Sequence, residues 1–269
     1  MDILEKIISN KRVELVRQKE AISLTQLKQL LKGEEDFADN SLTKVSFKES
    51  LLKSDTGIIA EFKRKSPSKG WIFGDALVEE VVPAYELSGA SAVSVLTDEL
   101  FFGGSMTDLK IARQKVALPL LRKDFIIDEY QLYQAKILGA NVILLIASAL
   151  TLEQSKALSA TAQELELEVL LEIHSEEELA YLEPNIDVVG INNRNLSTFE
   201  TNIQLSFDLG ELIPDNFVKI SESGISQAET VCELRKVGFQ GFLMGENFMK
   251  TENPGKSLEA FIQKVRQGK

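Results

Sequence analysis

Residues 58–70 read IIAEFKRKSPSKG, a short apolar run that ends abruptly in lysine, arginine and serine. Runs of this length and composition are typical of strands that are buried on both faces of a parallel sheet. A doubly wound sheet normally places a glycine-rich turn after its first strand, and Lys63-Arg64-Lys65-Ser66-Pro67 is not such a turn. The segment therefore favours another parallel architecture.

Seven more apolar runs of similar length follow, and amphipathic segments separate them. The runs are Ala92–Leu96, Leu118–Arg122, Val142–Ile146, Val169–Ile173, Val188–Ile191, Phe217–Ile220 and Gly241–Met244. The predicted helices are Leu77–Leu87, Asp108–Lys115, Glu129–Leu138, Leu152–Leu165, Glu176–Leu182 and Ala228–Val237. Eight strands at an average spacing of about 26 residues predict a (β/α)8 TIM barrel of the α/β class.

The first fifty residues carry no strand pattern. Apolar residues recur there at helical spacing (Ile3, Ile7, Ile8, Leu15 and Val16), and Leu24–Leu31 predicts a second short helix. A closing helix is predicted at Ser257–Val265, after Pro254-Gly255. We therefore expect one TIM-barrel domain over residues 1–269, with an N-terminal helical extension at 1–50 and the barrel at 56–269.

Composition limits the partners and the compartment. The chain has 269 residues and a net charge of −11, an acidic balance that disfavours nucleic acid and anionic lipid. The N-terminus lacks the apolar stretch of a signal peptide, and no run is long enough to span a membrane. A single cysteine, Cys232, cannot form an internal disulfide. We expect a cytoplasmic, monomeric protein without nucleic-acid or membrane partners.

Polar and ionisable residues gather where the predicted strands end, which is where TIM barrels form their active sites. Such charges are costly to bury unless they are paired or used. The alternative is a set of salt bridges that only seals the top of the barrel. The residues concerned are Glu61, Lys63, Ser66, Arg122, Lys123, Asp124, Glu172, Asn192, Asn193, Arg194, Ser221, Glu222, Ser223, Gly224, Gly245, Glu246 and Asn247.

Two glycine-containing turns follow the last two predicted strands. They are Ser223-Gly224-Ile225 and Gly245-Glu246-Asn247. TIM barrels often hold a phosphate at this place through loop amides and the start of a short helix. Glycine lets the backbone approach phosphate oxygens closely, because it has no Cβ atom. The turns predict a phosphate site.

Several of these segments resemble the indole-3-glycerol-phosphate synthase family. Ile59–Gly70 is similar to the signature segment of that family. Five further blocks follow in the family's order: Ser94–Asp98 with Phe102 and Gly104-Ser105 after it, Leu121–Phe125, Leu171–His174, Gly190–Leu196 and Ser221–Ile225. The resemblance covers essentially the whole chain, including the N-terminal helices.

The resemblance implies a carboxy-lyase of tryptophan biosynthesis that needs no cofactor or metal. Its small phosphorylated substrate would be 1-(2-carboxyphenylamino)-1-deoxyribulose 5-phosphate. Ring closure, decarboxylation and dehydration would convert this compound to indole-3-glycerol phosphate. Independently of the resemblance, a ring closure of this kind needs paired acid and base groups in a pocket that excludes water. Burial and a second cation lower the pKa of a strand-end lysine whereas a glutamate raises it, so the balance stays open.

The resemblance also implies roles for individual residues. Lys123 would protonate the ribulose carbonyl, Lys63 would bind the anthranilate carboxylate and assist dehydration, and Glu172 would stabilise the developing cation or take a proton. The other implied positions are Glu61 and Asn192 for holding substrate and lysines, Arg194 and Ser223 for supporting the site, Ser66, Gly224, Gly245 and Glu246 for the phosphate, and Phe102 and Phe125 for the aromatic ring.

Two features fit the family pattern less directly, and two other functions compete. Trp71-Ile72-Phe73-Gly74 is bulkier than the family pattern predicts for the first βα loop, and we expect this loop to move over the substrate. The only histidine, His174, is expected to have a structural role rather than to shuttle protons.

One competing function is that of another phosphate-handling barrel, such as an isomerase or epimerase, although the presence of only one histidine disfavours a metal-dependent epimerase. The other is a binding barrel that has lost turnover.

Overall fold

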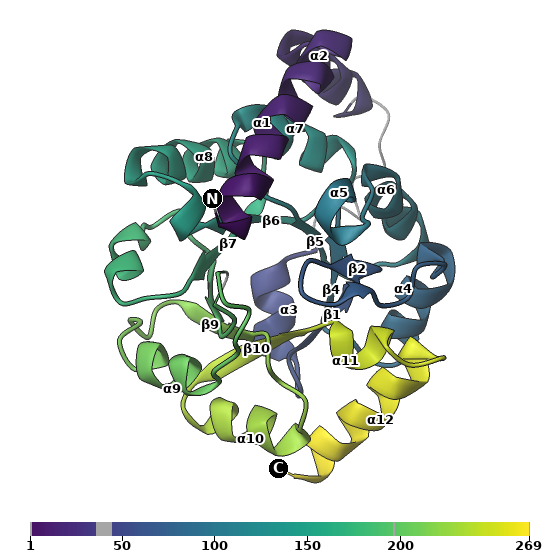
Figure 1. Ribbon diagram of the computed structural model, residues 1–269, viewed down its shortest axis with the longest axis vertical. Coiled ribbons are helices and arrows are strands. Elements are labelled where there is room, and N and C mark those ends of the chain that lie inside the picture. The colour runs from purple at the N-terminus through teal and green to yellow at the C-terminus, as the bar shows by residue number, and fades with distance from the viewer. Residues whose placement is uncertain (1, 36–44, 196, 269) are drawn as a thin grey trace.

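Eight parallel strands close into a barrel in the computed structural model, which describes residues 2–35, 45–195 and 197–268. Neighbouring strands follow the order of the chain, and the last strand pairs with the first (Figure 1). The strands are β1 (Ile58–Phe62), β4 (Ala92–Leu96), β5 (Leu120–Lys123), β6 (Val142–Ile146), β7 (Glu168–Ile173), β8 (Val188–Asn192), β9 (Val218–Glu222) and β10 (Phe239–Met244). The predicted TIM barrel with its N-terminal helical extension is confirmed.

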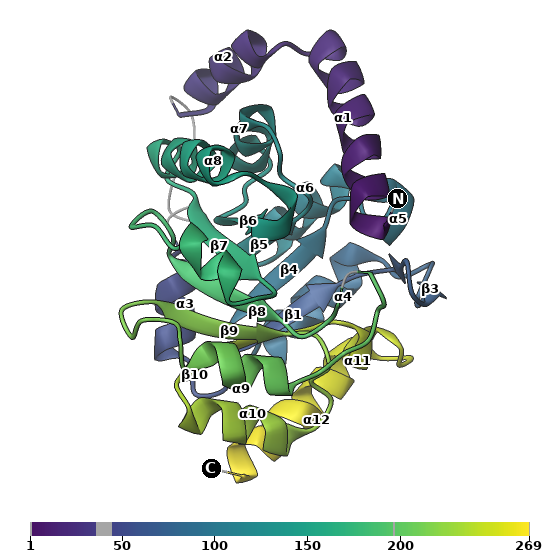
Figure 2. The same ribbon diagram turned by 60° about the vertical axis from the view of Figure 1, so that its left-hand side comes forward.

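Helices surround the barrel and cover the outer face of its strands (Figure 1 and Figure 2). Several begin at side chains that accept hydrogen bonds from the first turn, such as Ser105, Asp128 and Thr151. No helix within the described ranges has the length and apolar content that a membrane span requires. The main surrounding helices are α4 (Val78–Leu87), α6 (Met106–Lys115), α7 (Glu129–Ile137), α8 (Leu152–Glu164), α9 (Gln204–Gly210), α10 (Ala228–Lys236) and α12 (Pro254–Gln267).

Several predicted bounds differ from the structure by a few residues, and two of the differences involve a proline. The strand expected at Leu118–Arg122 begins only at Leu120, because Pro119 has no backbone N–H to donate to a neighbouring strand. The helix expected at Glu176–Leu182 is a 3-10 helix, η2 (Glu177–Tyr181). It ends close to Pro184, which disfavours helical backbone in the residue before it.

Short elements escaped prediction because they are too short to show a full period. They are the hairpin β2 (Lys65–Ser66) and β3 (Gly70–Trp71), α3 (Phe47–Lys53), α5 (Glu99–Phe102), η1 (Ala147–Ala149) and α11 (Glu246–Met249). The helix α9 was also missed. Most of these elements lie in the loops at the carboxyl ends of the strands, where the structure departs from a regular repeat.

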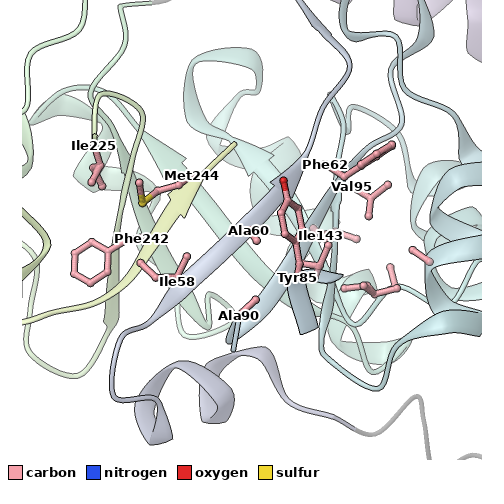
Figure 3. Packing of buried hydrophobic residues seen from close by; sticks show 14 of the residues in the cluster. Ile58, Ala60, Phe62, Tyr85, Ala90, Val95, Ile143, Ile225, Phe242 and Met244 are labelled. Atoms are coloured by element: carbon pink, nitrogen blue, oxygen red, sulfur yellow. The ribbon is translucent and has the colours of Figure 1, made fainter. Parts of the chain in front are cut away.

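Alternate residues of each strand belong to two different apolar layers. On β1, Ile58, Ala60 and Phe62 pack outward with the surrounding helices, and Figure 3 shows them beside Tyr85 of α4. Ile59 points instead into the barrel interior, where it joins a second cluster. Period-two alternation therefore decides which side chains of a strand can reach the interior.

The N-terminal extension contacts both ends of the barrel interior (Figure 2). Helix α1 (Ile3–Ala21) packs at the carboxyl ends of the strands, and α2 (Leu24–Glu35) packs on α7. Helix α3 lies at the amino-terminal ends, where the Glu168 carboxylate accepts the backbone N–H groups of Phe47 and Lys48. Within the predicted extension, residues 36–44 lie outside the described residues, as does Leu196 of the Gly190–Leu196 block.

Candidate active site

A cavity of about 280 Å³ opens at the carboxyl ends of the strands. Its lining includes every residue to which the resemblance assigns a role, from Glu61 on β1 to Glu246 on α11. Strand ends, loops and α1 all contribute to the wall. A concave site at this end of a barrel is the usual place for TIM-barrel chemistry.

Alternation along β5 separates neighbouring charges onto opposite sides of the strand. Leu121 lies in the interior cluster, so Lys123, two residues later, also points inward. Arg122 lies between them and points outward, where its guanidinium donates to the backbone carbonyl of Gln131 on α7. Of these two adjacent cations, only Lys123 lines the cavity.

Lys123 is held by two buried carboxylates. Its ammonium donates to Glu172 Oε2 at 2.8 Å and to Glu222 Oε2 at 2.6 Å. Burial alone lowers the pKa of Lys123, but Glu172, Glu222 and the nearby Glu61 outweigh burial and raise the pKa above its ordinary value. The three glutamates thus outweigh burial, which answers the question about the lysine pKa that the sequence left open. Lys123 is protonated at neutral pH and can act as a donor.

Glu172 is the carboxylate with the most polar partners in this group. Asn192 donates to its Oε1 atom at 3.0 Å, and the His174 Nε2 atom lies 3.3 Å from the same oxygen. Although burial raises the pKa of Glu172, Lys123 and His174 together lower it below the ordinary value. Glu172 is therefore ionised at neutral pH.

His174 lies between Glu172 and Glu178. Burial lowers the pKa of His174, but the two carboxylates outweigh this effect and raise the pKa to about 10. The ring is therefore a cation at neutral pH. His174 is not one of the described residues that line the cavity, in keeping with the expected structural role.

Glu61 and Lys63 form a second amine–carboxylate pair at the end of β1. Their charged atoms lie 2.5 Å apart, and Glu61 is buried while Lys63 keeps partial exposure to the cavity. A Cβ atom on Gly245 would lie 2.7 Å from Glu61 Oε1, so only glycine leaves room for this carboxylate. The β1 pair thus lies beside the end of β10.

Glu222 belongs to the site, although sequence reasoning assigned it no role. It accepts from Lys123 and lies against Gly190, whose missing side chain makes space for the carboxylate. Burial raises the pKa of Glu222 to about 7, with Lys123 opposing that rise and Glu172 adding to it. The sequence pattern that could have identified Glu222 is alternation on β9. Val218 and Ile220 face the interior, and Glu222, two residues later, faces the same way.

One end of the cavity is apolar. Phe102 of α5 and Phe125 after β5 place their rings 5.9 Å apart. Helix α1 closes this end with Ile3, Leu4 and Ile7, which the sequence did not connect with the site. The aromatic pair and the helix form a surface suited to a planar apolar group.

The opposite end is polar and built from tight turns. Ser223 and Gly224 follow β9 with φ angles of 66° and 77°, and Gly245 with Asn247 follows β10. A side chain on Gly224 would also collide with Thr201, so glycine is required there for space as well as for conformation. Exposed backbone amides at such turns are suited to an anion.

Side chains from the first loop and β8 meet across the mouth. Arg194 donates to Ser68 Oγ at 2.9 Å, and its other nitrogen lies 3.8 Å from Glu246 Oε2. Ser66 is buried, and no hydrogen bond to its hydroxyl is formed within the described residues. Ser66 is thus a residue of the cavity wall whose hydroxyl is buried and has no hydrogen-bond partner among the described residues.

Trp71 does not line the cavity. It is 63% exposed, it is not among the described lining residues, and it packs toward Gly103 at the end of α5. Pro67 and Ser68, at the tip of the same hairpin, line the cavity instead. Arg64 anchors the loop through two contacts with Asp108, at 2.5 and 3.0 Å. Movement of this loop over the substrate stays a prediction.

The chain is similar to known proteins along nearly its whole length. The model of the family described as indole-3-glycerol phosphate synthase matches residues 4–261. A protein of that name from Bacteroides thetaiotaomicron is 56% identical over 265 residues, which cover 98% of this chain and 99% of the relative. One from Polaromonas sp. is 42% identical over 261 residues, covering 96% and 97%.

Solved structures agree on the fold. The 3-hexulose-6-phosphate synthase from Salmonella typhimurium has a TM-score of 0.63 at 12% identity, covering 79% of this chain and 100% of that chain. A mutant tryptophan synthase alpha-subunit from Pyrococcus furiosus has a TM-score of 0.58 at 14% identity, covering 79% and 98%. At such low identity these likenesses show the barrel alone.

Proposed function

Because the chain belongs to the indole-3-glycerol phosphate synthase family, we propose how its cavity carries out that reaction. The enzyme is a carboxy-lyase of tryptophan biosynthesis. It converts 1-(2-carboxyphenylamino)-1-deoxyribulose 5-phosphate to indole-3-glycerol phosphate, with release of carbon dioxide and water. The assignment of individual residues to these steps is our proposal.

The observation that carries the proposal is the polarity of the cavity along its length. The substrate has an aromatic ring at one end, a phosphate at the other and the reacting ketone between them. The cavity has the Phe102–Phe125 pair at one end and the Gly224 turn at the other. Lys63 and Lys123 come from β1 and β5 and face the space between. The order of chemical groups along the substrate therefore matches the order of side chains along the cavity.

Ring closure is assigned to Lys123. As the aromatic carbon that bears the carboxylate attacks the ketone, the Lys123 ammonium gives a proton to the carbonyl oxygen. Glu222 touches the same ammonium and has a pKa of about 7, so it can return a proton to the amine. Departure of the carboxylate as carbon dioxide then restores the aromatic ring.

Dehydration is assigned to Lys63 and Glu172. Lys63 binds the substrate carboxylate at first and later protonates the hydroxyl that leaves as water, while Glu61 holds its ammonium. Glu172 takes the proton that the new five-membered ring loses. Its ionised state, supported by Asn192, suits it to be the base.

The phosphate is assigned to the polar end of the cavity. The backbone amides that follow Ser223 and Gly245 surround it, and the Ser66 hydroxyl completes the contact. Glu246 would contribute through its backbone N–H at the start of α11, because its carboxylate would repel a phosphate. Arg194 lies close to that carboxylate and balances its charge.

The test is a direct assay in which indole fluorescence reports product from the carboxyphenylamino substrate. We expect turnover by the wild type, and a loss of about 10²–10⁴-fold in kcat for Lys123→Ala with the fold retained. Lys115→Ala, which removes an exposed lysine from the end of α6, is the matched control and should leave kcat unchanged.

Three results would contradict these assignments. Turnover of a different sugar phosphate, with no indole product from this substrate, would support the rival isomerase or epimerase. Tight binding of the substrate without wild-type turnover would support a binding barrel. Full activity in Lys123→Ala would leave the reaction in place and remove Lys123 as its acid.

We also propose that the enzyme works as a cytoplasmic monomer. Helix α1 of the same chain closes the apolar end of the cavity, so the site does not need a residue from a second copy. Light scattering over a range of concentrations tests the monomer, and fractionation of cells tests the compartment.

A further inference from the structure

A lysine interrupts the buried face of α1. Ile7, Ile8 and Leu15 of this helix are buried, and Lys11 occupies the same face with only 1% exposure. A lysine at such a position is costly unless carboxylates meet its charge. The carboxylates that contact the Lys11 ammonium therefore show which segments of the barrel hold α1 in place.

Two buried aspartates meet the Lys11 ammonium. Asp98 Oδ2 lies 3.1 Å from Nζ and Asp124 Oδ1 lies 2.9 Å from it, while the more exposed Glu14 of α1 lies 3.0 Å away. Burial lowers the pKa of Lys11, but Asp124 and Asp98 outweigh burial and raise it above the ordinary value. Lys11 is thus a charged link between α1 and the ends of two strands.

Each aspartate also organises the segment in which it lies. Asp98 caps α5 by accepting the backbone N–H of Phe101 at 2.9 Å. Asp124 accepts the backbone N–H of Phe125 at 2.8 Å and the hydroxyl of Thr97 at 2.7 Å. These two segments carry the aromatic pair of the cavity, Phe102 and Phe125.

We propose that Lys11 is a positioning residue for the aromatic end of the cavity. Its ammonium holds α1, α5 and the segment after β5 together, and so sets the spacing of the rings that receive the aromatic part of the substrate. This inference rests on the placement of that ring under Proposed function. The proton donor Lys123 is held by Glu172 and Glu222, and Lys11 contacts neither of these carboxylates in the described structure.

The expected signature is a change in KM with little change in kcat. Lys11→Met keeps the length of the side chain and removes its charge. We expect KM to rise about tenfold, because misplacement of a binding surface weakens substrate positioning, while kcat stays within about threefold. A residue that served only stability would lower the thermal midpoint and the active fraction, and leave the KM of the folded enzyme unchanged.

Lys19→Met is the matched control. Lys19 lies on the same helix and also pairs with an aspartate of the barrel, Asp128, at 2.6 Å, but this pair is partly exposed. The control should leave both KM and kcat unchanged. An equal rise in KM for Lys19→Met would show that general loosening of α1 is enough, and would overturn the specific role of Lys11.

A second variant decides the matter if Lys11→Met does not fold. Asp98→Asn keeps an oxygen for the Phe101 N–H and removes the charge that Lys11 contacts, so KM should rise by a similar factor. In the double variant KM should rise no further than in the more affected single variant. An unchanged KM in Asp98→Asn, or a fall in kcat at constant KM, would overturn the proposal.

The parent assignment is checked separately with Phe102→Leu. A normal KM in this variant would remove the aromatic subsite itself, whereas a raised KM beside a normal KM in Lys11→Met would remove only the role of Lys11. Product formation by the wild type is measured first, so failure of the reaction cannot be confused with either result.

Discussion

Two buried groups of charges lie on the two sides of β5, and they differ in the access of their cations to the cavity. The inner cluster is Lys63, Lys123, Glu61, Glu172 and Glu222, and the outer cluster is Lys11, Arg122, Asp98 and Asp124. Each side chain of the outer cluster is at most 2% exposed, and neither of its cations is among the described lining residues, although Asp124 is. Both amines of the inner cluster reach the cavity. Enclosed cations suit a scaffold, whereas amines that face the cavity suit chemistry.

The carboxylates respond to this difference in opposite directions. Burial raises the pKa of Asp124, but Arg122 and Lys11 outweigh it and lower the pKa to about 2. Burial raises the pKa of Glu222 to about 7, and Glu172 adds to this rise while Lys123 opposes it. Asp124, directly after β5, is therefore an anion at neutral pH, whereas Glu222 on β9 titrates near neutrality.

The largest expected effect is on the rate, from the inner cluster. Glu172→Gln keeps the shape of the side chain and removes the proposed base. We expect kcat to fall about 10²–10⁴-fold with the fold retained, although Lys123 and His174 lose a charged partner. Steady-state kinetics measure kcat, and urea titration measures the stability of the fold. A large loss of stability at constant kcat would reverse the contrast between the clusters.

The next effect is on stability, from the outer cluster. Asp124→Ala leaves Lys11 and Arg122 without their shared carboxylate in a buried place. Removing one partner of a buried pair costs about 3–5 kcal/mol, and we expect a loss of that size in the free energy of unfolding. Urea titration at pH 7 measures it. An unchanged midpoint would mean that the outer cluster is not the scaffold we describe.

The smallest effect is a pH dependence of stability that differs in sign between the clusters. Asp124 has a lowered pKa, so the unfolded chain binds more protons and stability rises from about pH 2 to the ordinary aspartate value of 3.8. Glu222 has a raised pKa, so the folded chain binds more protons and stability falls between pH 4.5 and about 7. Burial also raises the pKa of Glu168 and Asp187, so Glu222→Gln should make the second slope shallower and leave the first unchanged. Urea titrations across this pH range test both signs, and a Glu222→Gln profile that falls as steeply as the wild type would contradict the assignment.

The barrel could be predicted because its strands are buried on both faces and read as apolar runs. Alternation within those runs also tells inward from outward, as Lys123 and Arg122 show on β5. Glu222 was open to the same reasoning, since it keeps step with Ile220. The proposed catalytic positions come chiefly from the resemblance, which names residues without giving their contacts.

The rest depends on contacts between distant segments, which no local pattern reveals. Lys11 lies on the buried face of α1, but nothing near it in sequence indicates Asp98 or Asp124. Val16 fitted the helical apolar pattern and yet is 57% exposed. The direction of Trp71 is set by packing against α5, which its sequence neighbours do not indicate.

The N-terminal extension has a consequence for how the enzyme is made. Lys19 of α1 meets Asp128, which is 109 residues later in the chain, and Phe47 of α3 meets Glu168 after 121 residues. These segments leave the ribosome before the partners that they contact, and such non-local contacts form slowly. One wall of the cavity is translated before the barrel it completes, so it can pack in place only after those later segments have been synthesised.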